Sequence, residues 1–189
     1  MKKTLAALGL TAAAMLPTMA VGDNYVIDTK GAHASINFKV PHLGYSFIKG
    51  RFNDFDGEFS YDPANIEAST VVVNIDTTSL DSNHAERDKH IRSGDFINAS
   101  KFSTATFKST SVKDNGDGSI TINGDLTLHG KTNPISIAAN FIGAGSDPWG
   151  GYRAGFEGTT RLELKDYGIA VMGPSSYVDM ELHVEGVRK

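Results

Sequence analysis

The chain has 189 residues, which is enough for one ordinary domain with a sizeable hydrophobic core. Its formal net charge of −4 gives no general attraction to nucleic acid or to anionic lipid. The absence of cysteine excludes disulfides, thiolate nucleophiles, iron–sulfur clusters and cysteine-ligated zinc.

The first predicted element is a secretory signal peptide over residues 1–22. A basic start (MKK) is followed by a largely apolar run at 5–16, and Pro17 then breaks the helix before a group of small residues. This order of basic, apolar and small-residue regions is typical of exported proteins. We expect cleavage after Ala20 or Gly22.

A membrane anchor is the alternative interpretation of the same residues. The apolar run is shorter than the ~20 residues that a spanning helix needs, and no later segment is long and apolar enough to span. We therefore expect a mature, exported and soluble protein with no stable membrane span, folded as a single domain over residues 23–189.

Alternation of apolar and polar residues dominates this domain. Ile36, Phe38 and Val40 share one face of a predicted strand, and the same period of two recurs at 119–128 and 177–184. Such alternation indicates strands with one solvent-exposed face, which is typical of antiparallel pairing. Further strands are predicted at 45–52, 55–61, 70–76, 104–112, 135–142 and 153–164.

Short turns connect these strands, and no linker or repeat divides the chain. Residues 114–118 and 129–134 carry the Asn, Asp, Gly and Pro residues typical of turns, and 143–151 is a glycine-rich loop. About eight or nine strands predict an all-β barrel or sandwich. We favour an extended antiparallel barrel, because glycines inside the strands mark sharp bends: Gly124, Gly155 and Gly158.

One charged stretch, NHAERDKHIRSGDF at 83–96, interrupts the strands. Asn83 is a suitable N-cap, Glu86 completes a capping-box pattern, and Gly94 is a good stop. We predict one short inserted helix near 84–92.

The charged stretch allows several functions. His84 and His90 are six residues apart, so they lie about 120° apart around a helix and do not form a zinc pair. A hydrolytic site built on Ser93 and His90 lacks the G-x-S-x-G elbow. A solvated helix would explain the charges through i,i+4 pairs, but a helix this short must dock to persist.

We therefore predict that the stretch is a docked structural cap over one end of the barrel. Phe96 and Ile97 follow the helix and are the expected anchors. Arg87 and Asp88 are expected to hydrogen-bond to neighbouring loops, because arginine offers five donors.

Four long motifs resemble the YceI family of exported bacterial proteins, which have a lipocalin-like barrel. They are HLGYSFIKGRFNDFDGEFSYD, TTSLDSNHAERDKHIRSGDF, GDLTLHGKTNPISI and DPWGGYRAGFEG, in that order, and the resemblance runs from about Tyr25 to Val187. It implies a periplasmic protein whose lumen holds a long apolar lipid, such as a polyisoprenoid or an isoprenoid quinone. It implies no reaction.

On this resemblance and the apolar rows, we expect the lipid to lie against lumen-facing side chains: Phe38, Phe47, Phe52, Phe59, Phe107, Leu126, Phe141, Phe156, Leu162 and Met180. Its polar head would lie at a mouth formed by His84, Arg87, His90, Arg92 and Trp149. No catalytic residue, metal or cofactor other than this isoprenoid-type lipid is expected, and no nucleic acid is expected as a partner.

Other partners and functions stay open at this point. A homodimer is one, and a membrane protein that donates or accepts the lipid is another. Two alternatives to a carrier, store or protector of lipid also remain: a lipid-modifying enzyme that uses the His84–His90 segment, and a protein-interaction module whose barrel core is filled.

Overall fold

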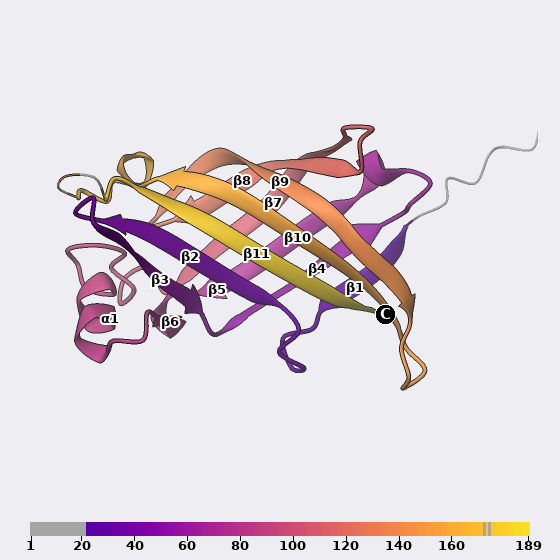
Figure 1. Cartoon of the computed structure of the whole chain (residues 1–189), viewed down its shortest axis with the longest axis horizontal. Coiled ribbons are helices and arrows are strands. Elements are labelled where there is room, and N and C mark those ends of the chain that lie inside the picture. Colours follow the sequence, from indigo (N-terminus) through magenta and orange to yellow (C-terminus); the bar gives the residue numbers. More distant parts are fainter. Residues whose placement is uncertain (1–21, 172, 174) are drawn as a thin grey trace, which may run out of the picture.

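The computed structural model describes residues 22–171, 173 and 175–189, which form an elongated antiparallel barrel (Figure 1). The predicted signal peptide and the cleavage position after Ala20 lie outside these residues, apart from Gly22. The strands are β1 (Asp23–Ile27), β2 (Ser35–His42), β3 (Ser46–Phe52), β4 (Phe55–Tyr61), β5 (Thr70–Asp76), β6 (Leu80–Asp81), β7 (Thr104–Asp114), β8 (Ser119–Leu128), β9 (Lys131–Ser146), β10 (Tyr152–Glu163) and β11 (Tyr177–Arg188).

Within the described residues, eight strands close the barrel in the order β1-β4-β5-β7-β8-β9-β10-β11, and β11 pairs back with β1. This confirms the predicted antiparallel barrel. The pairing shifts register in β7 between Ser109 and Ser111, opposite Gly124, and in β10 between Gly155 and Phe156. Two of the predicted glycine bends therefore coincide with irregularities of the ladder.

Three further strands, β2, β3 and β6, extend the sheet from one half of β11. β11 pairs with β1 through residues 186–188 and with β2 through residues 179–183. β3 and then β6 continue from β2, while β4 continues from β1. The segment between β1 and β2 leaves the sheet where β11 changes its neighbour.

Some strand boundaries differ from the prediction. β9 runs from Lys131 to Ser146, so the end of the predicted 129–134 turn and the start of the predicted 143–151 loop belong to a strand. Main-chain pairing with β8 and β10 continues there, although the residue types at 131–134 and 143–146 do not alternate between apolar and polar. β1 and β6, with five and two residues, are too short for alternation to reveal them.

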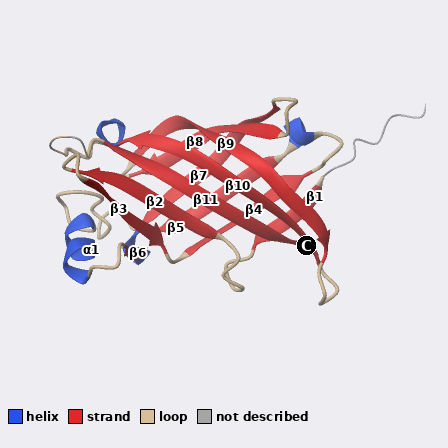
Figure 2. Cartoon of the chain, viewed as in Figure 1, coloured by secondary structure: helices blue, strands red, loops and turns tan. Residues whose placement is uncertain are grey.

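The helix α1 (Ala85–Ile91) covers one end of the barrel, next to β6 (Figure 2). The other short helices of the described chain are 3₁₀ turns: η1 (Ile66–Ala68), η2 (Thr77–Ser79) and η3 (Leu164–Tyr167). The predicted N-cap residue of this helix was wrong by one position. His84, not Asn83, is the N-cap, and its side chain accepts from the Arg87 N–H. Glu86 is therefore not at the third helical position that a capping box needs.

An aromatic cluster closes the opposite end, near the C-terminus. Tyr25 stacks on Phe59 with ring centroids 4.8 Å apart, and Tyr61 stacks on Phe141 at 5.4 Å. Phe156 contacts Phe59, Tyr61 and Phe141 edge-on or tilted. Such pairs add stability beyond the apolar area that they bury, so this end is firmly filled.

Candidate functional site

The barrel encloses an apolar cavity of about 520 Å³, a volume within the usual range of ligand pockets. Side chains from all eleven strands of the described chain line it, and α1 contributes at its open end. The polar groups among the lining side chains are His42, Arg87, His90, Glu157, Thr160 and Ser175. An otherwise hydrocarbon surface can hide an apolar chain but offers little to hold a polar one.

Seven of the ten predicted lumen residues line this cavity: Phe38, Phe52, Phe107, Leu126, Phe156, Leu162 and Met180. Their contact with a ligand stays a prediction. They lie on the inward positions of their strands, which is the placement that a period of two indicates.

Of the other three, Phe47 was placed in the lumen wrongly. Phe47 is 54% exposed, because Ile48 and Phe52 occupy the inward positions of β3 and Phe47 has the opposite parity. Phe59 and Phe141 do not line the cavity but belong to the aromatic cluster at its far end, and their contact with a ligand stays a prediction.

The predicted mouth residues divide in a similar way. Arg87 and His90 contact the cavity from α1. His84 caps the helix, and Arg92 donates to the Leu80 carbonyl at 2.8 Å, so both act on the fold around the opening. Trp149 was placed wrongly: it lies in the loop between β9 and β10, 78% exposed, at the closed end (Figure 1).

The cap over the opening is fixed by hydrogen bonds, as predicted. Asp88 is buried and accepts from both the N–H and the hydroxyl of Ser82, the first at 2.8 Å. Arg87 donates to the hydroxyl and the carbonyl of Ser82 at 2.7 and 2.5 Å. Ile97 is buried in the core, and the half-buried Phe96 faces the cavity. The charged stretch therefore joins the barrel through β6 and two apolar anchors.

The same stretch shows no catalytic arrangement among the residues that the structure describes. The His84 ring accepts from Arg87, while the His90 ring lies 3.5 Å from Asp95 and packs edge-on against Phe96. Ser93 accepts from the Asp95 N–H at 3.3 Å, and no hydrogen bond joins its hydroxyl to His90. The two histidines thus serve different neighbours.

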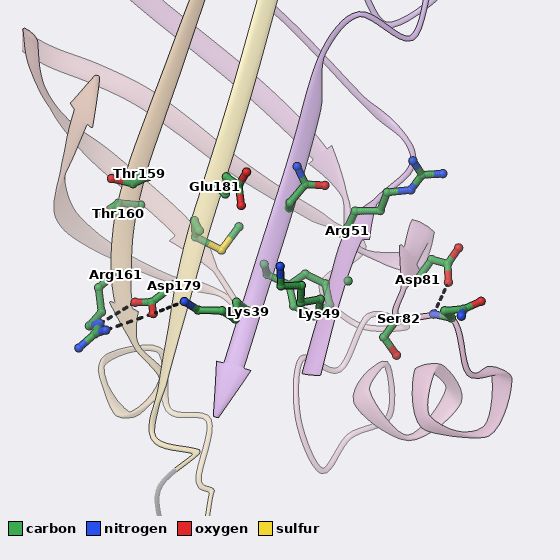
Figure 3. Close-up of a pocket in the computed structure, with 15 residues that line it drawn as sticks. Lys39, Lys49, Arg51, Asp81, Ser82, Thr159, Thr160, Arg161, Asp179 and Glu181 are labelled. Carbon is green, nitrogen blue, oxygen red and sulfur yellow. Dashed lines mark hydrogen bonds and ion pairs between the residues drawn. The ribbon is translucent and has the colours of Figure 1, made fainter. Parts of the chain in front are cut away.

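A larger hollow, about 890 Å³, lies on the outer face of β2, β3, β10 and β11 (Figure 3). Its lining is charged: Lys39, Lys49, Arg51, Asp81, Arg161, Asp179 and Glu181. These residues have the outward parity of their strands, so the hollow lies on the curved outside of the sheet. Phe38, Thr160 and Met180 line both the hollow and the lumen cavity. The hollow is less suited than the lumen to hold an apolar ligand, because charged side chains line it and it is open to solvent.

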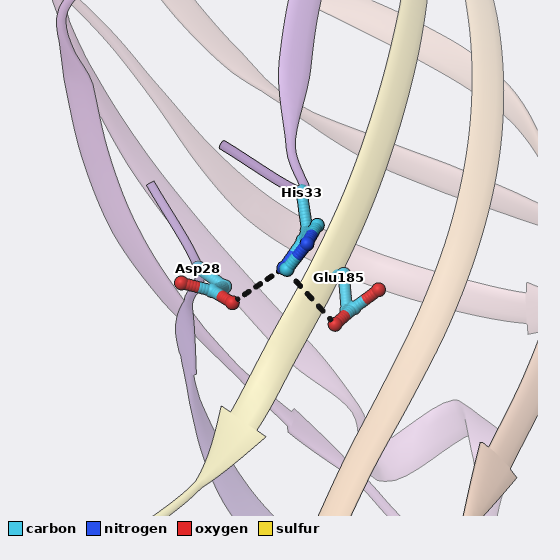
Figure 4. Close-up of side chains that lie close together, drawn as sticks. All are labelled: Asp28, His33 and Glu185. Carbon is cyan, nitrogen blue, oxygen red and sulfur yellow. Dashed lines mark hydrogen bonds and ion pairs between the residues drawn. The ribbon is translucent and has the colours of Figure 1, made fainter. Parts of the chain in front are cut away.

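A cluster missing from the sequence prediction fastens the point where β11 changes its neighbour. Asp28, His33 and Glu185 bring ligand atoms within 4.8 Å of one another, close enough for a metal to be considered (Figure 4). The Arg153 guanidinium lies among them, 2.6 Å from Asp28 and 2.5 Å from Glu185, and it also donates to Asp147 at 2.8 Å. Arg153 therefore supplies the positive charge that a metal would bring, and the cluster is a structural clasp.

The clasp predicts a pH dependence of stability. Hydrogen bonds from Arg153, and then from His33, lower the pKa of Asp28 to about 2 from an ordinary 3.8. A depressed folded-state pKa gives stability that is complete above pH ~4 and is lost as the pH falls through ~2. We expect Asp28→Asn to lower the free energy of unfolding by at most about 2 kcal/mol at pH 7. The difference in this free energy between the variant and wild type should shrink as the pH falls from about 4 to about 2.

Urea unfolding at a series of pH values measures this difference. Glu67→Gln is the matched control, because Glu67 is exposed in η1 and outside the clasp. A difference between Asp28→Asn and wild type that stays constant down to pH 2 would contradict this account of the clasp.

None of the helices in the described part of the chain has the length and apolar character that a bilayer span requires.

Comparisons with known proteins agree with this geometry. A family profile described as a YceI-like domain matches residues 25–186. A UPF0312 protein of Vibrio cholerae is 77% identical over the full length of both chains. Among solved structures, Burkholderia cenocepacia BcnA has a TM-score of 0.75 at 18% identity and covers 84% of this chain and 98% of its own. A polyisoprenoid binding domain from Saccharophagus degradans has a TM-score of 0.64 at 14% identity, covering 87% and 98%.

Proposed function

The chain belongs to the YceI family, and on that premise we propose that its barrel binds a long-chain apolar lipid of the polyisoprenoid or isoprenoid quinone class. The observation that carries the proposal is the cavity, whose walls are apolar side chains over almost their whole extent. The fold shared with a polyisoprenoid binding domain supports the same ligand class. The protein would carry, store or protect the lipid and would catalyse no reaction on it.

The energetics favour such a role. An isoprenoid chain in water exposes many methylene and methyl groups, and burial stabilises each methylene by about 0.8 kcal/mol. The lumen walls supply matching hydrocarbon, and the aromatic cluster seals the end farthest from α1. Binding by exclusion of water needs no catalytic group, which is consistent with the separate roles of His84 and His90.

The polar head of the lipid would lie at the α1 end. Arg87 and His90 contact the cavity there, and Ser175 lies on the same rim, where its hydroxyl donates to the Pro41 carbonyl at 2.6 Å. Arg87 has N–H groups beyond those directed at Ser82, so it can hold the cap and also donate to a head group.

We propose in addition that the protein works in the periplasm after removal of a signal peptide. The support is the basic, apolar and small-residue order at the N-terminus. N-terminal sequencing of periplasmic material should give Val21 or Asp23 as the first residue. Retention of Met1 together with membrane association would contradict export and release.

Mass spectrometry of an organic extract of the purified protein tests the ligand directly. A long-chain isoprenoid in stoichiometric amount is the expected result. A protein that purifies and remains empty when isoprenoids are offered would favour an interaction module instead. Turnover of an added lipid that disappears in both His84→Ala and His90→Ala would favour an enzyme.

A further inference from the structure

The hairpin between β2 and β3 displays apolar side chains to solvent beside the opening of the lumen. Leu43, Tyr45 and Phe47 are 59%, 89% and 54% exposed. The hairpin projects at the same end of the barrel as α1 (Figure 1). Isolated exposed apolar residues are ordinary, but three within five positions at the tip of one hairpin form a local patch.

The turn itself does not explain these residues. The Tyr45 N–H donates to the His42 carbonyl at 3.0 Å, and the two central residues, Leu43 and Gly44, have φ of 52° and 80°. Turns with two positive φ angles favour asparagine, aspartate or glycine at both positions. Leucine is a poor choice there, because its Cβ is crowded in the left-handed region. An apolar side chain thus occupies the tip at the expense of turn stability.

Cations flank the patch on the outer face. Lys39 on β2 and Lys49 on β3 are direct cross-strand partners (Figure 3). Like charges placed opposite each other destabilise a sheet unless an anion lies near. Lys39 has only a shared partner, Asp179 at 3.8 Å, which also binds Arg161 at 2.7 Å. Lys49 has no ion pair in the described part of the chain.

The patch is continuous with the lumen through the same two strands. Pro41, His42 and Ile48 line the cavity, while Phe47 and Lys49 alternate with Ile48 on the outer face. Lys39 also lies over the Phe47 ring, 4.8 Å from its centroid. One hairpin therefore presents apolar groups at its tip, positive charge behind them and a wall of the cavity on its inner side.

We propose that the β2–β3 hairpin docks the open end of the barrel onto an anionic phospholipid surface, so that the lumen ligand of the proposed function enters and leaves next to the bilayer. Leucine and aromatic side chains at the tip would enter the interfacial region, and Lys39 and Lys49 would face the phosphate groups. The overall charge of −4 does not oppose this, because the attraction is local and acts within about a Debye length.

A bilayer fits this patch better than a second protein does. Three side chains on a tight turn present far less surface than the roughly 800 Å² per partner of a stable protein interface. Shallow insertion of a few apolar groups beside cations is the usual pattern of peripheral membrane binding. A second copy of the chain and a protein partner are outcomes that the experiment below separates.

Vesicle sedimentation of the full mature chain tests the proposal. Wild type should bind vesicles of phosphatidylethanolamine with phosphatidylglycerol, and should bind pure phosphatidylcholine at least about tenfold more weakly. Leu43→Asn should weaken binding about tenfold, since it removes one inserted aliphatic side chain. Its melting temperature should stay equal or rise, because asparagine suits a positive φ. A merely structural role for Leu43 predicts a lower melting temperature and unchanged vesicle binding.

Two further variants keep the test decisive. Tyr45→Ser should also weaken vesicle binding without loss of fold, since Tyr45 is 89% exposed. Trp149→Ser is the matched control: it removes a 78% exposed aromatic residue at the closed end and should leave binding unchanged. Equal binding by wild type, Leu43→Asn and Tyr45→Ser would overturn the proposal.

The absence of native cysteine allows the orientation to be measured. An environment-sensitive dye on Ser46→Cys, at the tip, should be quenched by brominated lipid, and the same dye on Asp117→Cys, at the β7–β8 turn, should not. Equal quenching at both sites, or a dimer without vesicles that Leu43→Asn disrupts, would contradict membrane docking. Vesicle binding by a protein without extractable lipid would disprove the lumen function and leave docking intact. A lipid-loaded protein that does not bind vesicles would disprove docking and leave the lumen function intact.

Discussion

Leu126→Asp is expected to abolish retention of the lumen lipid. Leu126 is 7% exposed on β8 and lines the cavity, so a carboxylate there would enter a hydrocarbon environment. An unpaired buried carboxylate draws water or protons inward, and either change makes the lumen a poor solvent for an isoprenoid chain. Lipid content per protein, measured by mass spectrometry after folding is confirmed by circular dichroism, should fall to background.

The matched control lies one residue away on the same strand. Thr127 has the opposite parity, and its hydroxyl hydrogen-bonds to that of Thr132 at 2.8 Å, outside the lumen. Thr127→Asp should keep its lipid. If Leu126→Asp fails to fold, Ala139→Phe replaces it, because Ala139 is 3% exposed and faces the cavity, where a phenyl ring would fill ligand space without charge. A folded lumen variant that retains lipid stoichiometrically would place the ligand elsewhere.

The parts of this fold that repeat along the chain were predictable. Alternation located nine of the strands because each buries one face against the lumen and leaves the other in water. The same rule could have excluded Phe47 from the lumen, since Ile48 and Phe52 have the opposite parity on β3. Trp149 was misplaced for a different reason: it lies in a loop, where periodicity says nothing about direction.

The contacts between distant segments could not be predicted in this way. Arg153 joins Asp28, 125 residues earlier in the chain, to Glu185, 32 residues later. Each is one charged residue among many in the sequence, and only the closure of the barrel brings them together. The structure of the charged stretch at 83–96 was easier to predict, because its N-cap, its apolar anchors and its hydrogen-bonding residues are all close to the helix in sequence.

Asp88→Ala is expected to destabilise the cap strongly. Asp88 is 6% exposed and accepts from the N–H and hydroxyl of Ser82, which is itself 3% exposed. Removal of the carboxylate leaves two buried donors without their acceptor, which costs about 2–4 kcal/mol in the free energy of unfolding. For a domain of this size the melting temperature should fall by roughly 5–15 °C. The cap also borders the lumen, so lipid release into vesicles should become faster.

His84→Ala separates the structure of the cap from a function of its side chains. His84 is exposed, and its ring accepts a single hydrogen bond, at 3.2 Å from the Arg87 N–H. Loss of this N-cap contact should cost about 1 kcal/mol or less and leave lipid content within about tenfold of wild type. Thermal melts and lipid extraction on both variants decide between the roles. A His84→Ala protein that melts like wild type but carries no lipid would make the charged stretch the functional site. Loss of a purely structural contact would act on lipid binding only by lowering the stability of the cap.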